Sequence, residues 1–174
     1  MKEETKVRDE VKEERPGRLT IKSKFRIRKF ANDKAHQEDK PYAVSEFEGN
    51  LGLNEGIQEA LDLICGLGSP TSFANATAQT GVGDSTTAEA ATQTDLQAVT
   101  NKTYKGMDTG YPSRSAQTIN FRSTYGSTDA NYAWAEFIVR NGATALKDII
   151  RKVSAQGTKT SGQTWELTVQ ITMS

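Results

Sequence analysis

The chain has 174 residues, with 22 basic and 22 acidic side chains, one histidine and one cysteine. This length allows one compact domain with a stable core, or a small domain plus an arm. The lone Cys65 cannot form an intrachain disulfide, and with the lone His36 it argues against Cys/His zinc sites and most hydrolase triads. The chain starts with charged residues and contains no long apolar run, so we expect neither a signal peptide nor a membrane span.

The net charge of zero hides an uneven distribution. Residues 1–40 hold 13 of the 22 basic and 9 of the 22 acidic side chains, so this segment is positive and the rest is negative. So dense a set of charges leaves little apolar surface to offset chain entropy. We therefore predict a charged N-terminal arm with a basic strand at 1–40, beginning with a solvated tail at 1–17, and a β-rich structural domain at 41–174.

The basic strand within the arm has a period of two. Leu19, Ile21, Phe25 and Ile27 alternate with polar and basic residues, which is typical of a strand with one apolar and one basic face. The basic face either protects an edge strand from aggregation or binds an acidic partner. The second interpretation predicts a partner-binding set: Lys22, Lys24, Arg26, Arg28 and Lys29. Nucleic acid is the weaker prediction, because the body is acidic and such sites usually add aromatic residues or a domain-wide basic excess.

A short amphipathic helix is predicted after a polar loop around His36. Asn54 is the expected N-cap of this helix and Gly66 its end. Its apolar positions fall on one side: Ile57, Leu61 and Ile64. We expect the helix to cover one face of a sheet with this side. Cys65 is predicted to be a small buried apolar residue rather than a reactive thiol.

Residues 69–103 are rich in Ala, Thr, Ser and Gln and poor in charge, as long functional or interface-forming loops often are. The segment Gly81-Val82-Gly83-Asp84-Ser85 is a weak match to a phosphate-binding loop. It lacks the third glycine of dinucleotide-binding loops and the Gly-Lys-Ser/Thr ending of nucleotide-binding loops. We predict instead a short strand at 76–82 followed by a tight glycine turn.

The C-terminal half is rich in strand patterns. Alternation predicts strands at 118–125 and 165–173, and apolar side chains on both faces predict a buried strand at 132–139. Residues 145–153 fit either a helix or a strand. With a further strand at 42–47, these elements indicate a mainly β fold. The predicted fold is an antiparallel β-sandwich or flattened barrel with one short α-helix and an extended N-terminal arm.

Glu136 interrupts the predicted buried strand. A carboxylate at such a position needs a partner, for which Arg122 or Arg140 is a candidate. A catalytic acid would need a second convergent carboxylate or base, and the sequence identifies none. We therefore interpret Glu136 as half of a structural ion pair and expect no catalytic residue, no metal and no cofactor. Trp134 and Trp165 are predicted core residues.

Several short motifs carry a resemblance to a known group of proteins. They are Leu53-Asn54-Glu55-Gly56-Ile57, the run from Thr80 to Thr87, Thr92-Gln93-Thr94-Asp95-Leu96, the run from Asn101 to Lys105, the run from Phe121 to Tyr125, the run from Asp129 to Glu136, Arg151-Lys152-Val153, and Gly157-Thr158-Lys159. On these residues the chain resembles small structural proteins of tailed bacteriophages and prophages, and the motif order is similar to the N-terminal domains of phage tail-collar fibres. Such motifs belong to particle architecture and mark no active site. The resemblance also implies a strand at 145–153.

This resemblance and the composition lead to one expected function. A low-charge loop rich in Ala and Thr can pack against copies of itself, and a charged arm can order across a neighbouring subunit. We hypothesise a non-enzymatic capsid decoration, or cement, protein that binds and stabilises the major capsid lattice through its N-terminal arm. The expected partners are the major capsid protein and copies of itself, with a trimer favoured, and neither nucleic acid nor a membrane. The expected location is the virion, assembled in the cytoplasm of a bacterial host.

Two alternatives stay open. One is a tail, baseplate or fibre-attachment structural protein. The other is a receptor- or glycan-binding module, which the aromatic side chains of Tyr104 and Tyr111 in expected loops would serve.

Overall fold

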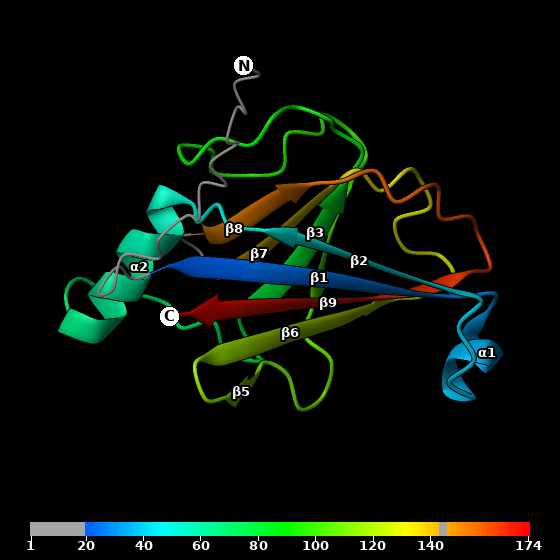
Figure 1. The fold of residues 1–174 in the computed structure, drawn as a ribbon, viewed down its shortest axis with the longest axis horizontal. Coiled ribbons are helices and arrows are strands. Elements are labelled where there is room, and N and C mark those ends of the chain that lie inside the picture. Colours follow the sequence, from blue (N-terminus) through cyan, green and yellow to red (C-terminus); the bar gives the residue numbers. More distant parts are fainter. Residues whose placement is uncertain (1–19, 143–145) are drawn as a thin grey trace, which may run out of the picture.

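Two antiparallel sheets, packed face to face, form the body of the protein in a computed structural model that describes residues 20–142 and 146–174 (Figure 1). In chain order the elements are β1 (Ile21–Phe30), α1 (Asp33–Gln37), β2 (Ala43–Gly49), α2 (Asn54–Cys65), β3 (Ala78–Gly83), β4 (Lys102–Gly106), β5 (Ser113–Ser115), β6 (Thr118–Tyr125), β7 (Glu136–Asn141), β8 (Lys147–Val153) and β9 (Thr164–Met173). The mainly β, sandwich-like fold that the sequence predicts is confirmed.

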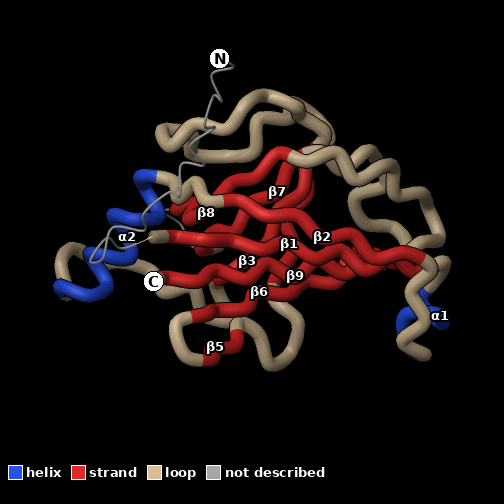
Figure 2. The backbone as a smooth tube through the Cα atoms, viewed as in Figure 1, coloured by secondary structure: helices blue, strands red, loops and turns tan. Residues whose placement is uncertain are grey.

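The two sheets have different sizes. Sheet A has the strand order β2-β1-β9-β6-β5, and sheet B has the order β4-β3-β7-β8 (Figure 2). The helices lie at opposite ends of the sandwich (Figure 1). One of them, α1, was not predicted: it forms where a polar loop was expected, and the side chain of Asn32 caps it by accepting a hydrogen bond from the N–H of Ala35.

The main core lies between the sheets and is rich in aromatic side chains. Phe25 of β1 stacks on Phe47 of β2 with ring centroids 5.1 Å apart, and both approach Phe137 of β7. Trp134 and Trp165 meet at 4.9 Å in an edge-to-face arrangement, and both are buried. The prediction that both tryptophans belong to the core is confirmed.

Strand β1 lies inside sheet A, between β2 and β9. It is therefore not an edge strand, and the sheet continues across the boundary predicted at residue 40. The reason is that Phe25 and Ile27 are fully buried against the body, so the apolar face of this strand outweighs its charges. The predicted solvated tail at 1–17 lies outside the described residues.

Sheet B corrects the prediction for the glycine-rich segment. Gly81 and Gly83 lie within β3, so no turn forms there. A Cβ atom on Gly81 would be 2.6 Å from Cγ2 of Ile138, and one on Gly83 would collide with the carboxylate of Glu136. Glycine is required because β7 side chains cross over the β3 backbone. Residues 147–153 form strand β8, which settles the open choice between helix and strand.

Helix α2 packs mainly by another side than the one predicted: of the three predicted positions it half-buries Ile57 and leaves the other two exposed. Gly56 and Glu59 are its buried residues, whereas Leu61 is 54% exposed and Ile64 is 80% exposed. Its N-cap is Leu53, with no side-chain cap from Asn54, and Cys65 is exposed rather than buried. The predicted end at Gly66 is confirmed, and Gly66 has the left-handed φ of 65° that glycine favours.

Close contact with β8 explains this orientation. A Cβ atom on Gly56 would be 2.5 Å from the carbonyl oxygen of Asp148, so only glycine allows the helix to lie this close. The carboxylate of Glu55 accepts a hydrogen bond from the N–H of Asp148, and that of Glu59 accepts one from the N–H of Thr71. Polar contacts to backbone therefore decide which side of α2 is buried.

Candidate functional site

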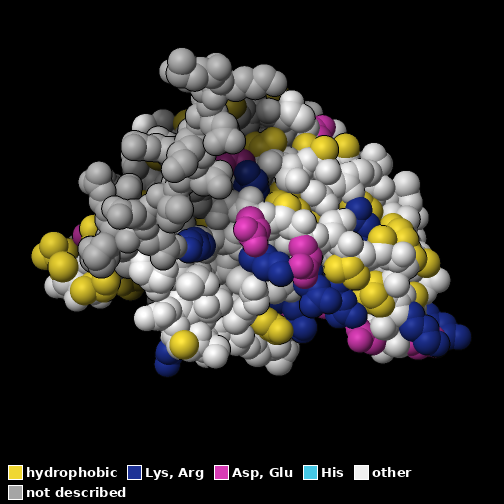
Figure 3. All heavy atoms as spheres, viewed as in Figure 1, with side chains coloured by type: hydrophobic (Ala, Val, Ile, Leu, Met, Phe, Trp, Pro, Cys, Tyr) yellow, Lys and Arg dark blue, Asp and Glu magenta, His cyan; other side chains and the backbone are white. Residues whose placement is uncertain are grey.

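The outer face of sheet A brings together four of the five residues predicted to bind a partner. Lys22, Lys24, Arg26 and Arg28 occupy alternate positions of β1, opposite to the buried Phe25 and Ile27. Figure 3 shows dark blue and magenta side chains gathered together on this side of the molecule.

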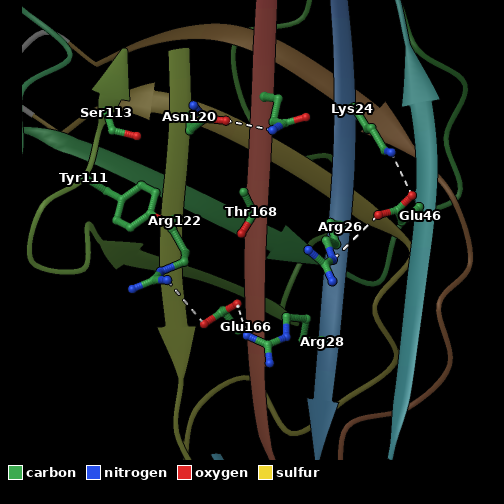
Figure 4. Close-up of a pocket in the computed structure, with 11 residues that line it drawn as sticks. Lys24, Arg26, Arg28, Glu46, Tyr111, Ser113, Asn120, Arg122, Glu166 and Thr168 are labelled. Atoms are coloured by element: carbon green, nitrogen blue, oxygen red, sulfur yellow. Dashed lines mark hydrogen bonds and ion pairs between the residues drawn. The ribbon is translucent and has the colours of Figure 1, made fainter. Parts of the chain in front are cut away.

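Strand register arranges these side chains in rows across the sheet. Arg26 of β1 pairs with Thr168 of β9, which pairs with Arg122 of β6 (Figure 4). The next row contains Lys24, Gln170 and Asn120. Since the central Thr168 is short and its neighbours are long, the face is hollowed here, and the hollow has a volume of about 470 Å³.

Ion pairs line one side of this hollow. The carboxylate of Glu46 on β2 is 2.7 Å from Nζ of Lys24 and 3.6 Å from Nε of Arg26. The hydrogen bond from Lys24 holds the pKa of the Glu46 carboxyl below its usual range. Glu46 is therefore shared by two cations, and Arg26 keeps only the longer contact.

A second carboxylate, that of Glu166 on β9, lines the hollow and lies between Arg122 and Arg28 in the lower part of Figure 4. Two guanidinium groups and an imidazole surround it at long range: Arg28 at 3.4 Å, His36 at 3.7 Å and Arg122 at 3.8 Å. Arg122 makes a shorter contact of 3.0 Å to Asp108, and its guanidinium lies 4.3 Å from the ring centroid of Tyr111. Arg28 also pairs with Asp39, so both arginines beside Glu166 have a second carboxylate partner.

Lys29, the fifth predicted residue, lies away from this face. Its Nζ donates a hydrogen bond of 2.6 Å to the carbonyl oxygen of Gln156 and lies 4.4 Å from the ring centroid of Trp165. Burial lowers the pKa of its ammonium group. The alternation of β1 explains the difference, because an odd-numbered position shares the face of Phe25 and Ile27.

Glu136 forms the predicted ion pair, but its partner is Arg151 rather than Arg122 or Arg140. Nη2 of Arg151 lies 2.6 Å from Oε2 of Glu136, and neither side chain is exposed. The two carboxylate oxygens also accept hydrogen bonds from the N–H groups of Gln97 and Ala98. A carboxylate with four donors and no exposed surface fits a structural role.

The two tyrosines considered as sugar platforms differ. Tyr104 lies in β4, donates a hydrogen bond to Asp95, and has the guanidinium of Arg140 3.5 Å from its ring centroid. Burial, followed by the bond to Asp95, raises the pKa of its phenol. Tyr111 borders the hollow, with Arg122 against its ring.

No family model, curated protein or solved structure matches this chain. Among the described residues, no group of three or more His, Cys, Asp or Glu side chains could hold a metal ion. Within residues 20–142 and 146–174, no helix has the length and apolar character needed to cross a membrane.

The sequence did not predict that acidic and neutral residues such as Glu166 and Thr168 belong to the site. Alternation already placed Glu166 and Thr168 on the polar side of the last strand, and Arg122 on the polar side of an earlier one. What the sequence lacks is a local signal for strand order. Only the position of β9 between β1 and β6 brings these residues to Arg26.

Proposed function

We propose that this protein is a non-enzymatic structural subunit of a bacteriophage particle, a capsid decoration protein that attaches to the major capsid protein through the outer face of sheet A. The observation that carries the proposal is the cluster of cations on this face. It presents five basic side chains, here called the basic face: Lys22, Lys24, Arg26, Arg28 and Arg122. Glu46, Glu48 and Glu166 lie on the same face, and Asp39 and Asp108 pair with Arg28 and Arg122. Arg26 is half exposed and reaches its carboxylate only at 3.6 Å, so an acidic group of a partner is best accommodated there.

The two outer faces of the sandwich differ in a way that supports attachment through sheet A. The loop at 84–101 covers sheet B, and its side chains Leu96 and Ala98 are buried. On sheet A the basic face is open along much of β1 and β9, and Arg26 has half of its side-chain surface exposed. A folded chain that covers one sheet and leaves the other charged and open is suited to binding a large partner.

The motifs that resemble phage structural proteins coincide with contacts that hold the sandwich together. Gly83 makes room for Glu136, Glu136 pairs with Arg151, and Arg151 donates a hydrogen bond to Gln93 in the covering loop. Lys159, from another motif, is fully buried and donates to the carbonyl oxygens of Gly126 and Asp129. Motifs of this kind preserve a shape, which is the property that a particle subunit needs.

Contacts between copies are expected at the free end of α2. Its apolar patch consists of Leu61, Leu63, Ile64 and Leu67, which are 39% to 80% exposed and gather at one end of the molecule (Figure 3). Contiguous exposed aliphatic groups favour protein contacts. Because an aliphatic strip on one copy can pack against the same strip on another, we propose that the patch contributes to the symmetric oligomer.

Counting the protein on purified particles tests this function. Quantitative mass spectrometry should find hundreds of copies, and image reconstruction should place them on the head. The variant Lys24→Glu/Arg26→Glu should lower occupancy strongly, whereas Arg114→Glu, an exposed position of β5 outside the hollow, should not. A few copies on the tail would favour the tail-component alternative, and complete absence from particles would refute the proposal.

A further inference from the structure

We propose that the hollow of the basic face is an anion clamp, in which Arg26 and Arg122 grip a carboxylate side chain from an acidic segment of the partner protein. This inference deepens the proposed function and rests on it for the identity of the partner.

The register of sheet A builds the clamp. Arg26 and Arg122 flank Thr168 in one row, and neighbouring strands are about 4.8 Å apart, so the two arginine backbones are separated by roughly 10 Å. Long side chains on both sides of a short one leave room for a ligand between two guanidinium groups, with the Thr168 hydroxyl on the floor (Figure 4). The volume of about 470 Å³ is within the range of ligand pockets.

Both guanidinium groups retain hydrogen-bonding capacity. Each carries five N–H donors. Arg26 reaches Glu46 only at 3.6 Å, and Arg122 uses Nε for Asp108 at 3.0 Å while its Nη1 is 3.8 Å from Glu166. A carboxylate between them would accept charge-assisted, bidentate hydrogen bonds from the N–H groups that the resident carboxylates leave unused.

The neutral side chains of the hollow suit a polypeptide. Nε2 of Gln170 donates to Oδ1 of Asn120 at 2.8 Å, which leaves the Asn120 amide N–H groups and the Gln170 carbonyl oxygen for a ligand. Ser113 adds a hydroxyl from β5. These donors and acceptors beside the arginines can pair with the backbone N–H and C=O groups that flank an acidic side chain of a bound peptide.

Resident carboxylates favour spaced acidic side chains over a nucleic acid. Glu46 and Glu166 lie in the same hollow as the arginines, and a continuous phosphate backbone would pass close to both. The lining contains one aromatic ring, that of Tyr111, and Arg122 already lies against it. An acidic segment can place a carboxylate between the arginines and neutral groups beside Glu46 and Glu166.

The test measures binding of the full-length protein to an eight-residue peptide of alternating glutamate and serine, by calorimetry at low salt. Arg26→Gln and Arg122→Gln should each weaken binding roughly tenfold or more. The matched control Arg114→Gln removes one positive charge from the same sheet, outside the hollow, and should leave the affinity within about twofold. Equal affinities in all three variants would overturn the clamp.

Thr168→Glu provides a second test that does not depend on the arginine variants folding. A carboxylate fixed between Arg26 and Arg122 should occupy the clamp, abolish peptide binding and leave the thermal midpoint equal to or above that of the wild type. Peptide binding by this variant would contradict the proposal. Inorganic phosphate that matches the peptide in affinity, or a DNA duplex that binds more tightly, would replace the acidic segment as the ligand and overturn it.

The two proposals fail separately. If particles carry the protein and the arginine variants keep full occupancy, the clamp is wrong and the decoration role stands. If the soluble protein binds the peptide through both arginines but no particle contains the protein, the clamp stands and the decoration role is wrong.

Discussion

Arg151 of β8 and Glu136 of β7 form an ion pair of 2.6 Å from which water is fully excluded. The pair does more than join two strands. Glu136 accepts hydrogen bonds from the N–H groups of Gln97 and Ala98, and Arg151 donates to the carbonyl oxygen of Thr87. The loop at 84–101 is thereby fixed to sheet B by hydrogen bonds to two charged groups that water does not reach.

Removal of one partner should therefore be costly. We expect Arg151→Met to lower the free energy of unfolding by about 3–5 kcal/mol, because it leaves the Glu136 carboxylate buried without a cation. Urea denaturation measures this change, and hydrogen exchange at Gln97 and Ala98 should become faster as the loop loosens. The double variant Arg151→Met/Glu136→Gln should recover part of the loss, since no charge is then stranded. A single-variant loss below about 1 kcal/mol would show that the pair behaves like an exposed one.

Gly83 should tolerate no side chain, although it lies in an ordinary strand. A Cβ atom there would be 3.0 Å from Cγ and Cδ of Glu136 and in collision with its carboxylate. Gly83→Ala should lower the free energy of unfolding by about 1–3 kcal/mol, the usual cost of overpacking. Gly106→Ala is the matched control, because a Cβ atom at the end of the neighbouring β4 would meet nothing within 4 Å. Equal stabilities of the two variants by thermal denaturation would contradict this account.

Patterns of period two predicted most of the sheet framework, because one face of each such strand is buried in the core. The last strand and the strand at 118–125 were predicted almost to the residue. Residues 145–153 remained ambiguous because aliphatic residues at 146, 149, 150 and 153 satisfy both periods, and only pairing with β7 favours the strand. Strand order and register come from contacts between distant segments, so Arg151 as the partner of Glu136 had no local signal.

The buried side of α2 was predicted wrongly from its apolar stripe for a different reason. Amphipathicity shows which side of a helix is apolar, but not whether the chain itself covers that side. Here the absence of a side chain at Gly56 lets the helix lie against β8, and this contact turns Leu61 and Ile64 outward. Half of the candidate site was predicted. The basic side chains of β1 were identified from the sequence, whereas Arg122 and Thr168 could be assigned to the site only once the strand order was known.

Asp148 should make stability depend on pH. Its side chain is buried, and neither carboxylate oxygen has a hydrogen-bond partner among the described residues. Burial, followed by the charge of Glu55, raises its pKa from 3.8 to about 8. The charged groups that act on it come from α2, β7, the covering loop and β4: Glu55, Arg140, Asp95 and Lys102.

The sign follows from proton linkage. Asp148 retains a proton in the folded chain that it releases above about pH 4 in the unfolded chain. The stability that this bound proton contributes is therefore complete below pH 4 and is lost as the pH rises to about 8. Asp148→Asn keeps the shape without this loss. Its stability relative to wild type should grow between pH 4 and 8, by roughly 2–5 kcal/mol in total. Urea denaturation over this range measures the difference, and parallel pH profiles would mean that Asp148 is hydrated or paired in solution.

The apolar patch of α2 should decide self-association. Ile64 is 80% exposed and Leu61 is 54% exposed on the same end of the helix, so a lysine at either position should be accepted by the fold. If copies meet there, each side chain buried at the contact stabilises it by about 1.5–3 kcal/mol, and Ile64→Lys should weaken association roughly tenfold or more. Sedimentation velocity over a range of concentrations measures this shift. Val99 is 93% exposed and stands alone in the covering loop, so Val99→Lys is the matched control and should leave the oligomer unchanged. A wild-type protein that sediments as a monomer at high concentration, or an oligomer equally insensitive to both variants, would place the contact between copies elsewhere.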